Sequence, residues 1–262
     1  MDNRAIGVFD SGLGGLTAVS ALRRLLPDEN IVYLADTARV PYGDKSLDEL
    51  NKCAEGDISF LLSKNVKLIL IACGTVSSTL TREQMESYGI KVIGVLEPAA
   101  RAAAEQTQNG KIGVIATAAS IKSGAYKARL ADIRPDCEIY PVPCPKLVPL
   151  IESGKTEGKE VKGALCEYLD PLKAEGIDTL VLGCTHYPLL KSEIGSILPE
   201  ASLIDVGAQA AKEVKDYLAE NDMLSENGGE CKFFASGNPE DFCGKASRFL
   251  GYQIEKVSIA KL

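Results

Sequence analysis

The chain repeats its own pattern of strands, and this repeat constrains the fold more than any other feature of the sequence. Three pairs of segments match in the same order and at nearly the same spacing. They are GVFDSG (7–12) with GVIATAAS (113–120), KLILIACGT (67–75) with DTLVLGCTH (178–186), and VIGVLEPAA (92–100) with LIDVGAQAA (203–211). The repeat places Cys73 opposite Cys184 and Asp10 opposite Thr117. It predicts two halves of similar structure.

Apolar runs alternate with amphipathic stretches along the chain. Residues 16–26, for example, place Leu and Val at helical spacing directly after the first run. Near-continuous apolar strands that alternate with helices are typical of parallel sheets covered on both faces. The predicted strands are residues 5–10, 31–35, 67–73, 90–95, 111–116, 138–142, 178–184 and 202–206.

We therefore expect an α/β fold with two pseudo-symmetric, doubly wound parallel-sheet domains facing a central cleft. The segment from Cys231 onward has no counterpart in the second half, so we expect it to return to the first domain. The predicted domains are residues 1–97 plus 207–262, with Asp10 and Cys73, and residues 98–206, with Cys184 and His186. Ligands of such sheets bind at the carboxyl ends of the strands, which places the expected site in the cleft.

Net charge, apolar run length and cysteine spacing exclude several kinds of partner and cellular setting. The 262 residues carry a formal charge of −7, and an acidic chain repels phosphate backbones, so no nucleic-acid partner is expected. The start MDNRAIGVFD does not resemble a signal peptide, and the longest apolar run is too short to cross a bilayer, so no membrane partner is expected. Eight cysteines without a C-x-x-C pair indicate free thiols in a reducing cytoplasm.

Cys73 and Cys184 end two matched apolar runs, each just before a helical pattern. A single cysteine is most often a small core residue. Two thiols at matched positions of duplicated halves, however, are expected to face one cleft, and the start of a helix favours the thiolate form. A thiolate and a thiol on opposite sides of an α-carbon can remove a proton from one face and deliver one to the other. This arrangement predicts inversion of a stereocentre without a cofactor.

Other polar residues accompany these cysteines. Asp10 precedes the glycine-rich turn DSGLGG, whose amides can bind a carboxylate, although an Asp there is equally typical of a turn or helix cap. His186, the only histidine, lies two residues after Cys184 and is a candidate proton partner, although such a histidine is more often structural. No metal is expected, because further ligands at suitable spacing are not evident.

Taken together, several segments resemble the glutamate racemase family. They are FDSGLGGLT (9–17), DTARVPYGD (36–44), LIACGT (70–75), GVLEPAARAA (94–103), LVPLIESGK (147–155) and LGCTHYPLLK (182–191). The resemblance implies an enzyme, without a cofactor, that interconverts L- and D-glutamate through two thiols. It also implies a supply of D-glutamate for bacterial peptidoglycan, and a homodimer.

The resemblance further implies residue roles. Cys73 is expected to act on one face of the substrate with help from Asp10, and Cys184 on the other with help from His186. The residues implied to bind the substrate are Ser11, Pro41, Tyr42, Gly43, Gly74, Thr75, Thr117, Glu152 and Thr185.

Gly74 departs from the family pattern, which has Asn after the first catalytic cysteine. An Asn side chain offers donors and an acceptor that Gly lacks. Because one hydrogen bond to a charged group contributes about 1.5–3 kcal/mol, we expect weaker substrate binding or slower turnover. Two alternatives remain open: a related racemase for another acidic amino acid, such as aspartate, and an impaired member that acts as a binding or inhibitory protein.

Overall fold

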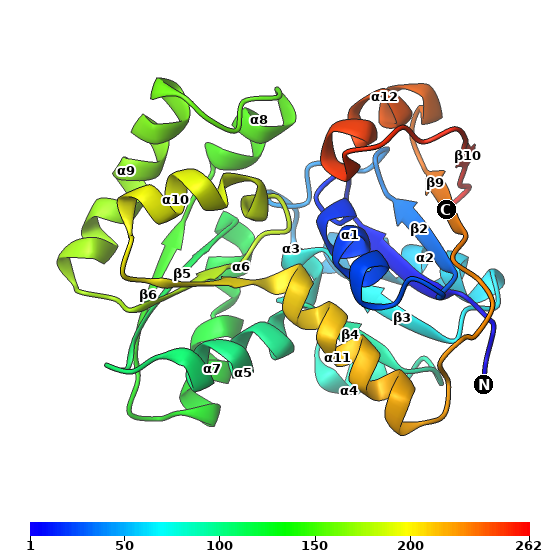
Figure 1. Cartoon of the computed structure of the whole chain (residues 1–262), viewed down its shortest axis with the longest axis horizontal. Coiled ribbons are helices and arrows are strands. Elements are labelled where there is room, and N and C mark those ends of the chain that lie inside the picture. The colour runs from blue at the N-terminus through cyan, green and yellow to red at the C-terminus, as the bar shows by residue number, and fades with distance from the viewer.

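A computed structural model describes the backbone of residues 1–262 and every side chain except that of residue 248. Two parallel sheets lie side by side, and helices cover both faces of each (Figure 1). This confirms the predicted fold of two parallel-sheet α/β units. The first sheet has the order β10 (Val257–Ile259), β9 (Cys231–Ala235), β2 (Ile31–Ala35), β1 (Ile6–Asp10), β3 (Leu68–Ile71), β4 (Val92–Gly94). The second has the order β6 (Glu138–Pro143), β5 (Lys111–Ala116), β7 (Thr179–Leu182), β8 (Ser202–Asp205).

The sequence repeat is visible in this topology. Strands β2-β1-β3-β4 of the first sheet and β6-β5-β7-β8 of the second follow the same order. Each matched pair of segments therefore occupies the same place in the two sheets. The C-terminal strands β9 and β10 extend the first sheet beyond β2, as the lack of a counterpart had suggested.

Helices fill the connections between strands. They are α1 (Leu16–Leu25), α2 (Leu47–Ser63), α3 (Gly74–Ser77), α4 (Arg82–Glu86), α5 (Leu96–Gln106), α6 (Ala118–Ser123), α7 (Ala125–Ile133), α8 (Leu147–Glu152), α9 (Lys159–Ala174), the 3₁₀ helix η1 (Tyr187–Leu190), α10 (Lys191–Ile197), α11 (Val206–Glu220) and α12 (Pro239–Leu250). Helices α5 and α11 pack against each other between the two sheets. The division into residues 1–97 plus 207–262 and residues 98–206 stays a prediction.

Alternation along the strands builds a core on each face of the first sheet. Successive side chains of a strand point to opposite faces. Val8 and Leu70 accordingly join the cluster under α1, whereas Phe9 and Ile71 join the cluster under α2. Helix α2 begins with a capping box in which Ser46 and Glu49 satisfy each other's backbone amides.

The two predicted strands that were to end at cysteines are shorter than expected. Strand β3 ends at Ile71 and β7 at Leu182, so Cys73 and Cys184 both lie two residues beyond the sheet. The chain leaves the sheet here to begin the next helix or turn, which carries both thiols past the sheet edge.

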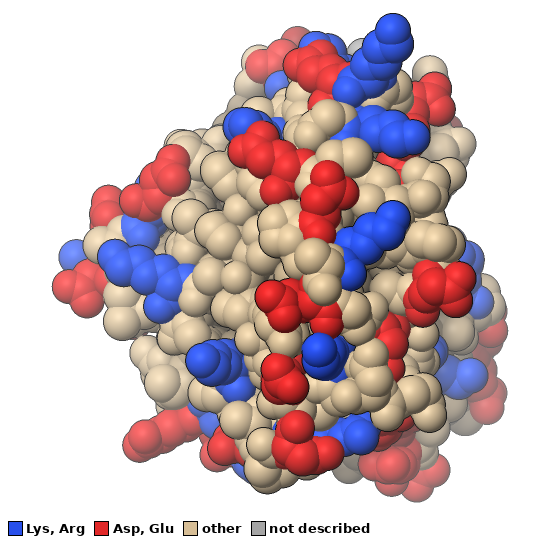
Figure 2. Space-filling view, turned by 90° about the vertical axis from the view of Figure 1, so that its left-hand side faces the viewer, with Lys and Arg blue, Asp and Glu red and all other residues tan. Residues whose placement is uncertain are grey.

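Acidic and basic side chains alternate over the face shown in Figure 2 rather than gathering by sign. Mixed charge of this kind is typical of a solvated surface. Among the described residues, no helix combines the length and the apolar character needed to cross a bilayer.

Candidate active site

The carboxyl ends of strands from both sheets meet around a cavity of about 220 Å³. Every site residue predicted from the sequence lines it. These are Asp10, Ser11, Pro41, Tyr42, Gly43, Cys73, Gly74, Thr75, Thr117, Glu152, Cys184, Thr185 and His186. The structure thus brings together segments that are far apart in the chain, and it places one thiol from each half in the same cavity.

Cys73 is buried at the N-terminal cap of the short helix α3. Its sulfur lies 3.8 Å from the Ser11 hydroxyl. Burial, followed by the neighbouring charge of Asp10, raises the pKa of the Cys73 thiol to about 12. The expectation that the helix start would favour a thiolate is therefore wrong for Cys73, because α3 is only four residues long and burial dominates.

Cys184 has a different environment. A turn and then the 3₁₀ helix η1 follow it, so no α-helix begins at this thiol as the sequence had suggested. Its sulfur lies 3.7 Å from Nδ1 of His186. The second ring nitrogen of His186, Nε2, lies 3.1 Å from Oε1 of Glu152 at the end of α8. Glu152, His186 and Cys184 therefore form a continuous chain of polar contacts.

This chain determines the charge of the imidazole. Burial by itself lowers the pKa of His186, but hydrogen bonds with Cys184 and Glu152, together with the charges of Cys184 and Asp10, outweigh burial and raise the pKa to about 10. The same hydrogen bond to His186 lowers the pKa of Glu152. His186 is therefore cationic at neutral pH.

Asp10 connects the two halves of the site. Its Oδ2 accepts a hydrogen bond from the Gly12 amide at 2.9 Å, and its Oδ1 accepts one from the Thr185 hydroxyl at 3.4 Å. Among the described side chains, none of its hydrogen bonds reaches Cys73, so Asp10 acts on that thiol through its charge. Asp10 thus links the first strand to the residue that follows Cys184.

The glycine-rich turn provides space for the histidine. A Cβ at Gly14 would lie 2.4 Å from Nδ1 of His186 and 2.5 Å from the Thr185 hydroxyl oxygen. Any side chain at this position would displace His186 from its place beside Cys184. The sequence indicates that the amides of this turn can bind a carboxylate, but the packing requirement at Gly14 depends on contacts with the distant His186 and Thr185.

Two threonine hydroxyls lie side by side in the wall of the cavity. The hydroxyl oxygens of Thr75 and Thr117 are 3.0 Å apart, which joins the segment after β3 to the segment after β5. The Thr117 hydroxyl also caps α6 by accepting from the Ser120 amide. This pair connects the two sheets at the site.

Gly74 is in tight backbone contact with the other half. A Cβ at Gly74 would lie 2.4 Å from the carbonyl oxygen of Gly183, the residue before Cys184. An Asn side chain at position 74 therefore does not fit without a backbone shift. The replacement of Asn by Gly removes an amide, as predicted, but it also permits this close approach.

Sequence reasoning missed several residues of the cavity wall. Cys144 is the most notable, because this buried third thiol follows β6 directly. Its position just after a predicted strand was the available signal. The other residues missed are Gly12, Val40, Asp44, Ala118, Pro145, Val148 and Pro149.

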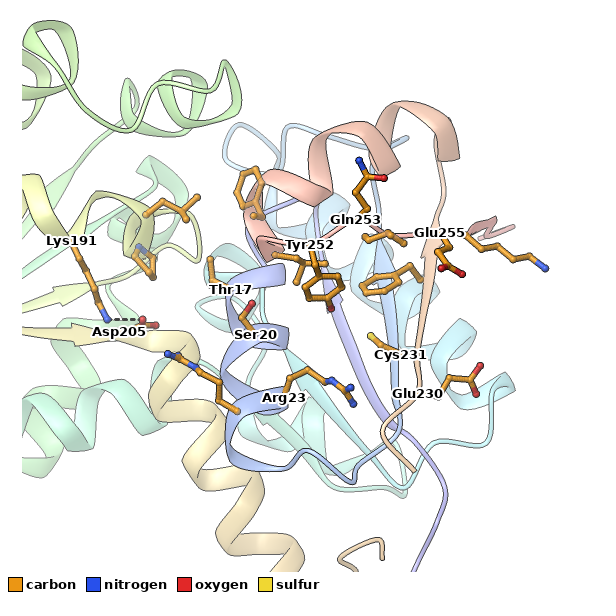
Figure 3. Close-up of a pocket in the computed structure, with 18 residues that line it drawn as sticks. Thr17, Ser20, Arg23, Lys191, Asp205, Glu230, Cys231, Tyr252, Gln253 and Glu255 are labelled. Carbon is orange, nitrogen blue, oxygen red and sulfur yellow. Dashed lines mark hydrogen bonds and ion pairs between the residues drawn. The ribbon is translucent and has the colours of Figure 1, made fainter. Parts of the chain in front are cut away.

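A larger cavity, of about 900 Å³, lies among α1, β9, η1 and the C-terminal segment (Figure 3). It contains neither Cys73 nor Cys184, so it is not the candidate site. Phe249 lines it and packs edge-on against the ring of His186, with 5.7 Å between ring centroids. This cavity therefore borders His186 through the ring of Phe249.

Two parallel-sheet halves that bring Cys73 and Cys184, at matched positions of the repeat, to one shared cavity define an α/β protein with a site equipped for acid–base chemistry. Comparison with known proteins agrees with this class. The model of the Asp/Glu/Hydantoin racemase family matches residues 17–214, and the chain belongs to this family. It is therefore an amino-acid racemase, an isomerase.

Relatives are similar along nearly the whole chain. The glutamate racemase of Carboxydothermus hydrogenoformans is 42% identical over 252 residues, which are 96% of this chain and 94% of the relative. That of Mycobacterium leprae is 44% identical over 261 residues, covering 98% and 96%. The crystal structure of glutamate racemase from Francisella tularensis in complex with D-glutamate superposes with a TM-score of 0.92 at 38% identity, covering 100% of this chain and 98% of that one.

Proposed function

We propose that this protein is a glutamate racemase that interconverts L- and D-glutamate by proton transfer between Cys73 and Cys184. The observation that carries this proposal is the presence of both thiols, one from each half, in one cavity. The D-glutamate complex of the Francisella tularensis relative supports glutamate as the substrate. The cavity volume of about 220 Å³ lies below the roughly 300–1,000 Å³ of pockets for drug-sized ligands, which favours a small amino acid.

The two thiols need opposite protonation states. Cationic His186 donates a hydrogen bond to Cys184, which favours a thiolate there. Burial beside Asp10 keeps Cys73 as a thiol. In this state Cys184 removes the α-proton from one face of the substrate, and Cys73 delivers its proton to the other face. The product leaves Cys184 as a thiol and Cys73 as a thiolate, and this is the state that the opposite enantiomer requires.

The other lining residues are proposed to hold the substrate. Backbone amides at Ser11, Tyr42 and Gly43 can donate to carboxylate groups. The hydroxyls of Thr75, Thr117 and Thr185 offer both donors and acceptors. The carboxylate of Asp10 provides a partner for an ammonium group.

Incubation with D-glutamate in heavy water tests the proposal. The wild type is expected to form L-glutamate that carries deuterium at the α-carbon, and Cys73→Ser and Cys184→Ser are each expected to abolish racemisation. Aspartate is assayed in parallel. A higher kcat/KM for aspartate would support the alternative substrate, and the absence of any α-hydrogen exchange would support a binding protein.

We propose that the protein works in the cytoplasm as a homodimer and that its D-glutamate supplies peptidoglycan synthesis. The support is the similarity to glutamate racemases over nearly the full chain. Analytical ultracentrifugation tests the dimer, and rescue of a D-glutamate auxotroph tests the physiological role.

A further inference from the structure

A buried cluster of charged residues lies behind one wall of the catalytic cavity. The connection from β2 to α2 contributes Val40, Pro41, Tyr42, Gly43 and Asp44 to that wall. Behind it, Asp36, directly after β2, and Asp57 of α2 share Arg39 and Tyr42 as partners, and both aspartates have an exposed fraction of 0%. Two carboxylates that are fully buried together carry a large desolvation cost unless they are paired or protonated.

Both carboxylates contact the wall segment. Arg39 Nε donates to Asp36 Oδ2 at 2.6 Å, and Arg39 Nη2 donates to Asp57 Oδ1 at 2.8 Å. The Tyr42 hydroxyl is hydrogen-bonded to Asp36 and also lies 3.1 Å from Asp57 Oδ2. Ser236, just after β9, donates to Asp36 Oδ1 at 2.6 Å. The cluster therefore anchors the segment on both sides of Pro41.

The two contacts of the Tyr42 hydroxyl indicate whether Asp57 is protonated. A phenol has one hydrogen to donate, and the closer contact, with Asp36, takes it. The contact between Tyr42 oxygen and Asp57 Oδ2 is then favourable only if Asp57 carries a proton and donates it. Burial and then the charge of Asp36 raise the pKa of Asp57 well above its ordinary value, although the charge of Arg39 and the hydrogen bonds with Tyr42 and Arg39 act in the opposite direction.

We infer that Asp57 is a positioning residue for the racemase: as a carboxylic acid it donates to Tyr42 and accepts from Arg39, and it thereby holds residues 40–44 against the substrate. The inference rests on the proposed function. Asp57 itself does not line the cavity, so it acts through the segment that it holds. Gly56 supports this arrangement, because a Cβ there would lie 3.3 Å from Nη1 of Arg39.

Two substitutions of Asp57 show whether the segment is held by hydrogen bonds of a neutral side chain or by a negative charge. Asn at position 57 reproduces the protonated acid, because its oxygen can accept from Arg39 while its amide donates to Tyr42. Asp57→Asn is therefore expected to keep KM and kcat within about twofold of the wild type. Asp57→Ala releases the segment, and we expect it to raise KM for D-glutamate about tenfold while kcat changes less, because binding of the ground and transition states weakens together. Glu55→Ala, an exposed position on α2, is the matched control.

Hydrogen exchange provides a readout that does not depend on turnover. Backbone amides in residues 38–46 are expected to exchange faster in Asp57→Ala than in the wild type, and to remain protected in Asp57→Asn and Glu55→Ala. If the wild type failed to racemise glutamate, the proposed function would be lost, and exchange would still decide whether Asp57 holds the segment.

Tyr42→Phe removes only the hydroxyl, so it provides a second test if Asp57→Ala does not fold. It is expected to raise KM in the same direction as Asp57→Ala. The inference is overturned by an unchanged KM and unchanged exchange in Tyr42→Phe or in folded Asp57→Ala. Loss of binding in Asp57→Asn as severe as in Asp57→Ala also overturns it, because that result would show that an ionised carboxylate is required.

Discussion

The Nδ1 atom of His186 lies 3.7 Å from the sulfur of Cys184, whereas the sulfur of Cys73 lies 3.8 Å from the Ser11 hydroxyl oxygen. The two thiols occupy matched positions in the repeat, but their surroundings differ. A cation stands beside Cys184, and the charge of Asp10 acts on Cys73. This asymmetry suits the proposed two-base racemisation, which requires the two thiols to play different roles in each direction.

Replacement of the histidine tests this asymmetry. His186→Asn removes the cation beside Cys184, and we expect kcat/KM to fall by about 10²-fold, at the lower end of what a positioned acid or base contributes. The loss should be equal for L- and D-glutamate, because two enantiomers have equal free energies in water and the ratio of the two kcat/KM values is therefore fixed. Circular dichroism assays in both directions measure it. A kcat/KM within threefold of the wild type would contradict a catalytic role for His186.

The contact between His186 and Cys184 also predicts how kcat/KM of the wild type depends on pH. The pKa of His186 is raised to about 10, so the imidazolium is present below that pH and is lost as the pH rises through it. We expect kcat/KM to decline at about pH 10 and this alkaline limb to be absent in His186→Asn. The stability of the fold changes with pH in the same direction as kcat/KM. Protonation of His186 contributes its full stabilisation below the ordinary pKa of about 6.5, and this contribution is lost as the pH rises to about 10. A histidine signal in NMR that titrates near its ordinary value would contradict both statements.

The sequence predicted the fold and the cavity well for identifiable reasons. Buried parallel strands are continuous apolar runs, so β2 and β5 were bounded correctly, and the repeat indicated that Cys73 and Cys184 occupy matched places. It could not predict contacts that depend on how distant segments pack. The shared partners of Asp36 and Asp57 require α2 to fold back over the end of β2, and no local pattern specifies this.

The close approach of Gly74 to Gly183 could not be predicted from the sequence either, because it depends on the distance between the two halves. Gly74→Ala places a Cβ against the backbone carbonyl of Gly183. Gly74 directly follows Cys73, and Gly183 directly precedes Cys184. The two thiols should move apart, and because small misplacements strongly affect proton transfer we expect kcat to fall about tenfold, with a smaller change in KM. Gly163→Ala is the matched control, since a Cβ there meets nothing within 4 Å.

The Asn variant distinguishes two effects at the same position. Gly74→Asn adds the amide that the family pattern contains, but it also adds the Cβ that collides with Gly183. We expect its kcat/KM to fall with that of Gly74→Ala. A kcat/KM above the wild type would show instead that the backbone yields and that the missing amide limits the natural enzyme.

A buried ion pair between Lys67 and Glu29 lies at the amino ends of the strands of the first sheet, away from the candidate site. Lys67 precedes β3, and its Nζ lies 2.5 Å from Oε2 of Glu29, with side-chain exposures of 0% and 2%. The ammonium also donates to the carbonyl oxygens of Asp2 and Met223, and Glu29 accepts from the Ser225 amide, so the pair ties the N-terminal segment to the connection before β9. Lys67→Met leaves a buried carboxylate without its partner, and we expect the free energy of unfolding to fall by about 3–5 kcal/mol.

Urea denaturation measures this loss, and two further variants establish its cause. Lys67→Met combined with Glu29→Gln removes both charges, so it should recover part of the lost stability. Arg82→Met breaks an ion pair whose side chains are 90% and 65% exposed, and it should cost no more than about 1 kcal/mol. Turnover by the folded fraction of Lys67→Met should match the wild type, because Lys67 lies at the end of β3 opposite Cys73. A loss of stability in Lys67→Met no greater than that in Arg82→Met would show that burial does not make this ion pair important.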